Sequence, residues 1–140
     1  MNKNKPLVVV MSRNYSTGLS IIRSLGIEGY PVDLIASANR TGQSATIAGS
    51  KYINNYVEVI AKKVELDRDE ALLKELLKYK GKYDNKPVLF PTDDYTTSVM
   101  DLNRGVLEDI FIMPKVAGGA AGDLKHLMDK SVQSLSLIHI

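Results

Sequence analysis

The stretch that decides the fold runs from residue 7 to residue 37 and reads LVVVMSRNYSTGLSIIRSLGIEGYPVDLIAS. Its valine-rich start, Leu7 to Met11, is the continuous apolar run expected of a parallel strand buried on both faces. Ser16 to Glu28 follows with leucines and isoleucines at helical spacing, and Gly29 marks the end of that helix. Val32 to Ser37 then predicts a second strand. Together these elements have the size of a βαβ unit.

The rest of the chain repeats the alternation. Strands are predicted over Tyr52–Ile60, Pro87–Pro91 and Asp109–Met113, and helices from Asp67 towards Gly81 and over Asp94–Arg104. The alternation predicts an α/β fold, a Rossmann-like, doubly wound parallel sheet of about five strands in the order 3-2-1-4-5.

Apolar stripes predict which faces of the two later helices are buried. In the earlier helix the stripe is Leu72, Leu73, Leu76 and Leu77. In the later one it is Tyr95, Val99, Leu102 and Val106. The small and polar residues of Thr41–Ser50 predict either a loop or a short irregular helix.

Composition excludes several classes of function. The chain of 140 residues has the size of one domain, and no apolar run approaches the ~20 residues that cross a bilayer. Without cysteine it has no disulfide, zinc–thiolate site or cysteine nucleophile. A net charge of +2 gives no strong field for nucleic acid or a membrane. We expect a cytoplasmic protein with small-molecule partners, and homo-oligomer formation stays open.

A first candidate binding loop, Ser12–Gly18, follows the first strand. In an open parallel sheet, ligands bind beyond the carboxyl ends of the strands, near the point where strand order reverses. The loop offers hydroxyls, backbone N–H groups and a helix N-terminus to an anion. An ordinary turn, in which Ser16 caps the helix and Gly18 packs close to the sheet, is equally supported.

A second candidate loop, Pro91–Tyr95, follows the predicted fourth strand. Its neighbouring acids, Asp93 and Asp94, suit recognition of a substrate amine, binding of a cation or action as a base. The alternative is that Thr92 or Asp93 caps the next helix while the other acid is solvated. The residues alone favour this alternative, because acids are common at helix starts.

A dinucleotide site is poorly supported. The G-x-G-x-x-G fingerprint needs glycines where this chain has Ser12, Asn14 and Thr17. Arg40 is the one feature that favours an NADP-binding domain.

A segment rich in glycine and alanine, Gly118–Gly122, predicts a hinge. We expect one domain over residues 1–117, the hinge at 118–122 and the first helix of a second module over 123–134. Both histidines lie beyond the hinge, so neither a nucleophilic triad nor a histidine metal site is supported. Residues 135–140 read LSLIHI, which resembles a translated sequencing-adapter remnant, and we expect them to be non-native.

Four motifs follow one another in the chain: Ser12–Leu19, Pro31–Leu34, Leu89–Asp94 and Met128–Lys130. Together they resemble the N-terminal portion of bacterial ATP-grasp carboxylate–amine ligases, a group that includes D-aspartate ligase-like enzymes. The similarity runs from Leu7 to about Gln133.

The resemblance implies a pre-ATP-grasp domain and a reaction in which ATP and magnesium convert a carboxylate into an acyl phosphate, which an amine then attacks. It also implies that Lys130 approaches ATP. The residues implied to line the substrate pocket are Asn14, Ser16, Thr17, Gly18, Thr92, Asp93 and Asp94.

The family's phosphate-covering loop, second nucleotide lysine and magnesium-binding carboxylates lie downstream of anything in this sequence. We therefore assign no catalytic or metal residue here and expect the chain alone to be inactive, with no tight binding of ATP or magnesium. A free-standing domain that binds a small anion at Ser12–Gly18 is the first alternative, and an NADP-binding domain is the second.

Overall fold

The computed structural model describes residues 5–13, 15–38, 42–43, 47, 49–60 and 65–113, with the backbone alone for Tyr15 and residues 65–68. Asn14, Arg40 and Lys130 lie outside these ranges, as do the expected hinge, second module and non-native tail. Residues 41, 44–46 and 48 also lie outside the described ranges.

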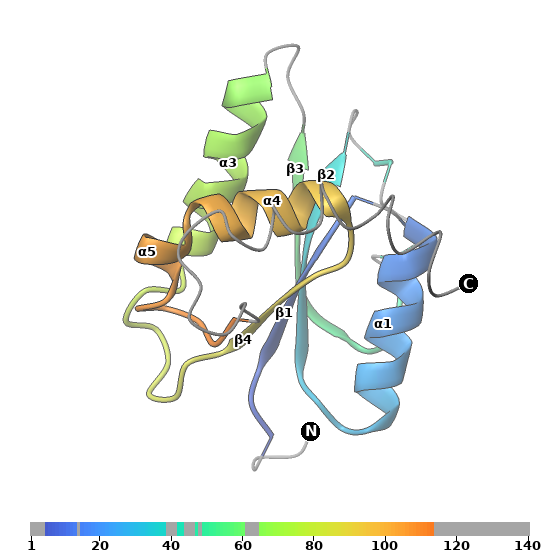
Figure 1. The fold of residues 1–140 in the computed structure, drawn as a ribbon. Helices are drawn as coiled ribbons and strands as arrows, with labels where there is room; N and C mark the ends of the chain where they lie inside the picture. Colours follow the sequence, from blue (N-terminus) through green and yellow to red (C-terminus); the bar gives the residue numbers. More distant parts are fainter. Residues whose placement is uncertain are drawn as a thin grey trace, which may run out of the picture.

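The described chain folds as an α/β structure (Figure 1). Its elements are β1 (Val8–Ser12), α1 (Tyr15–Ile27), β2 (Val32–Ala38), β3 (Ile53–Ile60), α3 (Glu65–Leu77), β4 (Val88–Pro91), α4 (Asp94–Leu102) and α5 (Arg104–Leu107). The four strands are all parallel and lie in the order β3-β2-β1-β4. This confirms the order predicted for the first four strands. Each helix in the described part is too short or too polar to cross a bilayer.

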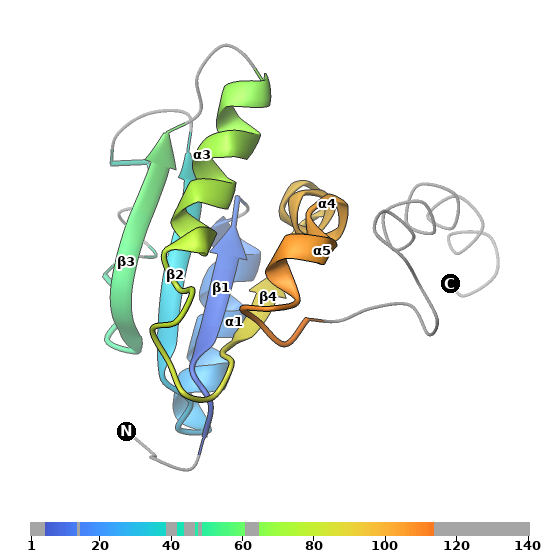
Figure 2. The ribbon, with the colours of Figure 1, turned by 90° about the vertical axis from the view of Figure 1, so that its left-hand side faces the viewer.

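Helices cover both faces of the sheet, with α1 on one side and α3, α4 and α5 on the other (Figure 2). Side chains alternate between the faces of a strand. Val8 and Val10 therefore pack with Ile22 of α1, while Val9 and Met11 belong to the core under α3 and α4. The valine-rich run is buried on both faces, as its composition predicts.

The predicted stripe on α3 is confirmed in its central part. Leu72 and Leu76, one helical turn apart, are fully buried, and Leu73 packs against the same core. Leu77 is 38% exposed, so it lies at the margin of the stripe. Gly81, at a φ of +71°, then turns the chain away from the helix.

The face predicted for the helix after Asp94 is wrong in its second half. Leu102 and Val106 are 56% and 52% exposed. The predicted spacing assumed one continuous helix, but α4 ends at Leu102 and the chain turns at Asn103, whose side-chain amide donates to the carbonyl of Val99 at 2.8 Å. The shorter α5 then buries Leu107 instead.

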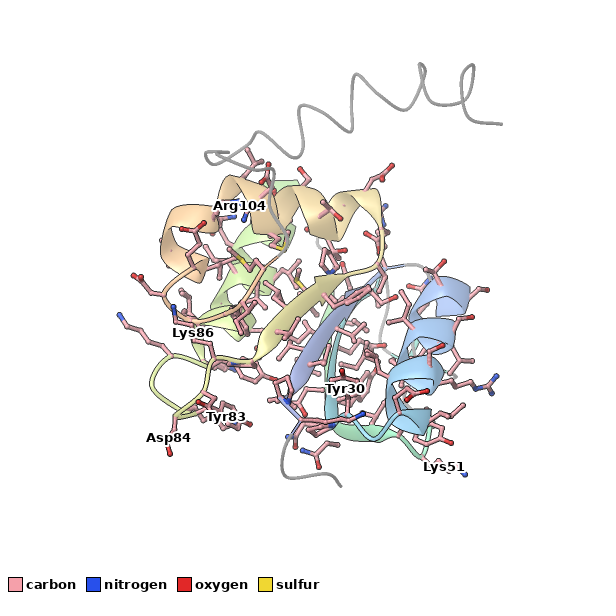
Figure 3. The ribbon with its side chains drawn as sticks, turned by 60° about the horizontal axis from the view of Figure 1, so that its bottom comes forward. Tyr30, Lys51, Tyr83, Asp84, Lys86 and Arg104 are labelled. Carbon is pink, nitrogen blue, oxygen red and sulfur yellow. The ribbon has the colours of Figure 1, made fainter. Side chains whose placement is uncertain are left out.

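A buried ion pair holds the junction of these two helices. Arg104 begins α5 (Figure 3). It donates from Nε and Nη2 to Oδ1 of Asp101 at 3.2 and 3.0 Å, and both side chains are almost completely buried. Oε1 of Glu108 lies 3.8 Å from Nη1 of the same guanidinium group. A charge buried in this way depends on its partner, since desolvation of a lone ion is costly.

The fifth strand predicted over Asp109–Met113 is not confirmed. Within the described residues it forms a single parallel bridge to β4, between Val88 and Ile112. Pro91, in β4, has no N–H group to donate to a further rung of that ladder.

Candidate functional site

The strand order reverses between β1 and β4. From β1 the chain continues outward to β2 and β3, and it then returns to the other side of β1 to form β4. Such a switch point separates the loops that leave the carboxyl ends of the two strands, which is where ligands bind in open parallel sheets. The two candidate loops of the sequence are the loops that meet here.

Direct contacts join these loops. The backbone N–H of Arg13 donates to Oδ2 of Asp93 at 2.7 Å. The backbone N–H and Oγ1 of Thr92 both donate to the carbonyl oxygen of Met11, at 3.1 and 3.0 Å. Residues about eighty positions apart in the sequence thereby form one wall, which fits the rule that parallel strands end at the same edge.

Asp93 is the N-cap of α4, which confirms the alternative that Thr92 or Asp93 caps this helix. Its Oδ1 accepts from the backbone N–H and the hydroxyl of Thr96, at 2.9 and 3.1 Å, and the Thr96 hydroxyl in turn faces the backbone N–H of Asp93. Oδ2 is occupied by the N–H of Arg13. Both carboxylate oxygens therefore have structural partners, and the charge also stabilises the positive end of the helix.

Asp94 differs from its neighbour, because it is exposed in the first turn of α4. An open hollow of about 390 Å³ lies at this point, lined by Arg13, Asp93, Asp94 and Tyr95. The adjacent acids thus divide into a capping carboxylate and one that reaches solvent in the hollow.

Sequence reasoning missed Arg13 and Tyr95. The guanidinium carbon of Arg13 lies 5.3 Å from the centre of the Tyr95 ring. The hydroxyl of Tyr95 donates to Oδ1 of Asp69 at 2.7 Å, which ties the start of α4 to the first half of α3. The available signal was a charged residue directly after a buried strand at the expected switch point.

The remaining residues of the first loop have separate roles. A Cβ on Gly18 would lie 2.3 Å from the hydroxyl oxygen of the buried Ser12, so Gly18 allows α1 to pack against the end of β1, as predicted. Ser16 and Thr17 are exposed and do not line the hollow. The expectation that Ser16 caps the helix is wrong, because α1 already begins at Tyr15.

A second polar cluster lies on the α3 side of the sheet, near the start of β2. Asp33 is 1% exposed and accepts from the hydroxyl of Tyr79 at 2.7 Å and the amide of Asn55 at 3.2 Å. Burial and this bond to Asp33 raise the pKa of Tyr79 far above its usual range, which keeps the phenol protonated as a donor. These contacts account for the buried carboxylate as a link between β2, β3 and the residues after α3.

Within the part of the chain that the structure describes, no group of three or more histidine, cysteine, aspartate or glutamate residues is placed to hold a metal ion. No protein-family model matches the chain, and no curated protein or solved structure is significantly similar to it.

Proposed function

We propose that this chain is the N-terminal, Rossmann-like domain of an ATP-grasp-type ligase, which joins a carboxylate to an amine through an acyl phosphate. In this proposal the hollow between the ends of β1 and β4 forms the substrate side of the cleft. The bond between the N–H of Arg13 and Oδ2 of Asp93 carries the argument, because it brings two of the resembling motifs into contact at the switch point.

The charges in the hollow support a pair of substrates with opposite charges. Asp94 offers an exposed carboxylate to an ammonium group, and Arg13 offers a cation a short distance along the same wall. Thr92 and Asp93 hold this wall in place through their bonds to β1. A hollow with both signs of charge suits a carboxylate and an amine better than a strongly anionic cofactor.

The other assigned residues complete the proposal. Ser16 and Thr17 do not line the hollow, so they would contact only a part of the substrate that extends beyond it towards the start of α1. Asn14 and Gly18 are assigned to the same substrate side, and Lys130 would approach ATP. In this proposal the sheet of the parent enzyme has a fifth strand next to β4, on the side where Ile112 forms its bridge to Val88. A cytoplasmic location fits a ligase that uses ATP.

ATP and magnesium belong to this proposal only through the parent enzyme. The described residues include no set of ligands that fits magnesium. We therefore assign them no step that passes through the metal or the nucleotide, and they act by binding and orienting substrates. The chain of 140 residues should not hydrolyse ATP.

The source gene tests the parent enzyme. A reading frame that continues beyond the codon for Gln133 into a glycine-rich loop and later acidic ligands supports the ligase. A stop codon directly after Ile140 would contradict the ligase assignment and favour a free-standing binding domain, which would use the same hollow.

A titration of the chain followed by nuclear magnetic resonance tests the site. Sodium acetate and methylammonium chloride should each shift the amide signals of Arg13 and Tyr95, whereas NADP should not. Shifts that NADP alone produces would select the nucleotide-binding alternative. Measurable ATP hydrolysis by the purified chain would count against the proposal.

A further inference from the structure

Arg13 lines the hollow at the carboxyl end of β1. Its backbone N–H donates to Asp93, and its guanidinium carbon lies over the ring of Tyr95, 5.3 Å from the ring centre. Arg13 is exposed, and none of the ion pairs found in the described part of the chain engages its guanidinium group. A guanidinium that stacks on a ring keeps its N–H donors at the edge, where a planar oxyanion binds in bidentate fashion.

The ring that supports Arg13 is itself held in place. The Tyr95 hydroxyl donates to Asp69 of α3 at 2.7 Å, and Tyr95 is partly buried against the core. Three residues from the β1–α1 loop, α4 and α3 therefore form one connected arrangement. It reduces the number of positions that the arginine side chain samples before a ligand arrives, which favours binding.

The surrounding charges select among oxyanions. Oδ1 and Oδ2 of Asp93 both have structural partners, while Asp94 is exposed at the rim of the hollow. Nearby carboxylates repel a dianion more strongly than a monoanion, because the Coulomb energy grows with the charge of the ligand. The arrangement therefore favours a carboxylate over a phosphate dianion.

We propose that Arg13 is the residue that binds the carboxylate of the substrate, and that Tyr95 and Asp69 are positioning residues that act through it. This inference rests on the proposed function, since it takes the hollow as the substrate site. The bond from the backbone of Arg13 to Asp93 does not depend on the side chain, so substitution of the side chain leaves the junction of the loops in place.

The test uses the whole chain, labelled with ¹⁵N, and sodium acetate as the probe, with sodium chloride keeping the ionic strength constant. Acetate should shift the Nε–H signal of Arg13 with a saturable curve. Arg13→Gln should weaken acetate binding by about tenfold, as expected for the loss of a charge-assisted contact. Arg23→Gln, which removes the same charge from an exposed position of α1, should leave it unchanged.

The test of Tyr95 and Asp69 measures acetate binding and the Nε–H signal of Arg13, which a purely structural role of these two residues would leave unchanged. Tyr95→Phe and Asp69→Ala should each weaken acetate binding about threefold and broaden the Nε–H signal of Arg13. Asp69→Asn keeps an oxygen acceptor for the tyrosine hydroxyl, so its acetate affinity and the width of its Arg13 Nε–H signal should match those of the wild type. Equal effects of Asn and Ala at this position would overturn the positioning role.

Three results separate the inference from the proposed function. If Arg13→Gln binds acetate as the wild type does, the inference fails while the hollow remains the substrate site. If sodium phosphate binds more tightly than acetate, the carboxylate assignment is wrong. If acetate does not bind to the wild type at all, the hollow is not the substrate site and the proposed function loses its support.

Discussion

The backbone N–H of Arg13 and Oδ2 of Asp93 lie 2.7 Å apart, although 80 positions separate the two residues in the sequence. The same carboxylate caps α4 through Oδ1. One side chain thus fixes a helix start and joins the two loops at the switch point. Its neighbour Asp94 makes no such contacts and is exposed.

Substitution of the two acids should therefore have unequal effects. Asp93→Ala removes the cap and the bond to Arg13, and we expect the free energy of unfolding to fall by about 2 kcal/mol. Asp94→Ala should change it by less than about 0.5 kcal/mol, because it alters an exposed position. Urea denaturation of both variants measures the difference, and equal losses would contradict the capping role.

Gly18 and Gly105 offer a matched pair of substitutions within helices. Gly18→Ala places a methyl group 2.3 Å from the Ser12 hydroxyl, and we expect a loss of about 1–2 kcal/mol from overpacking. A Cβ on Gly105 meets nothing within 4 Å, so Gly105→Ala should stabilise the chain by up to about 1 kcal/mol. Thermal unfolding of both variants checks the opposite signs. A stabilising Gly18→Ala would refute the close approach of α1 to β1.

The ion pair between Asp101 and Arg104 predicts a large effect at the junction of α4 and α5. Asp101→Ala leaves a buried guanidinium without its main partner, and the expected loss is about 3–5 kcal/mol. The double variant Asp101→Leu with Arg104→Met should recover most of it, because it removes both charges. Lys78→Ala, which breaks the exposed pair with Glu75, serves as the control and should cost less than about 1 kcal/mol. A loss of that small size at Asp101 would show that the pair is dispensable.

The bond between Tyr79 and Asp33 predicts a dependence of stability on alkaline pH. Burial and this bond raise the pKa of Tyr79 above its ordinary value of 10.0, so the unfolded chain releases the proton at a lower pH than the folded chain. The contribution of the protonated Tyr79 to the free energy of unfolding is complete below pH 10 and is lost as the pH rises above it. Tyr79→Phe should flatten this part of the pH profile in urea denaturation between pH 9 and pH 12. Tyr83→Phe, at the exposed ring that stacks on Tyr79, should keep the decline. An unchanged profile in Tyr79→Phe would show that other groups cause it.

Local patterns in the sequence determined the order of elements and much of the core. The apolar run of β1, the helical spacing in α1 and the paired leucines of α3 predicted elements that the structure confirms, because burial of a strand or helix face leaves a periodic trace in the chain. The position of both candidate loops at strand ends followed from the same patterns. For the loop after β4, the sequence left a binding role and a cap by Thr92 or Asp93 as alternatives, and the structure confirms the cap at Asp93, since acids at helix starts have a local electrostatic reason.

Only the tertiary structure decided which acid is structural and which is exposed, because the N–H group that donates to Asp93 belongs to Arg13, 80 positions earlier in the sequence. It likewise brought Arg13, Tyr95 and Asp69 together from three separate elements. It also exposed Leu102, because a break between α4 and α5 overrode an apolar pattern that predicted one continuous helix. Such contacts depend on which groups meet across the folded sheet, and sequence periodicity records only which face of each element is apolar.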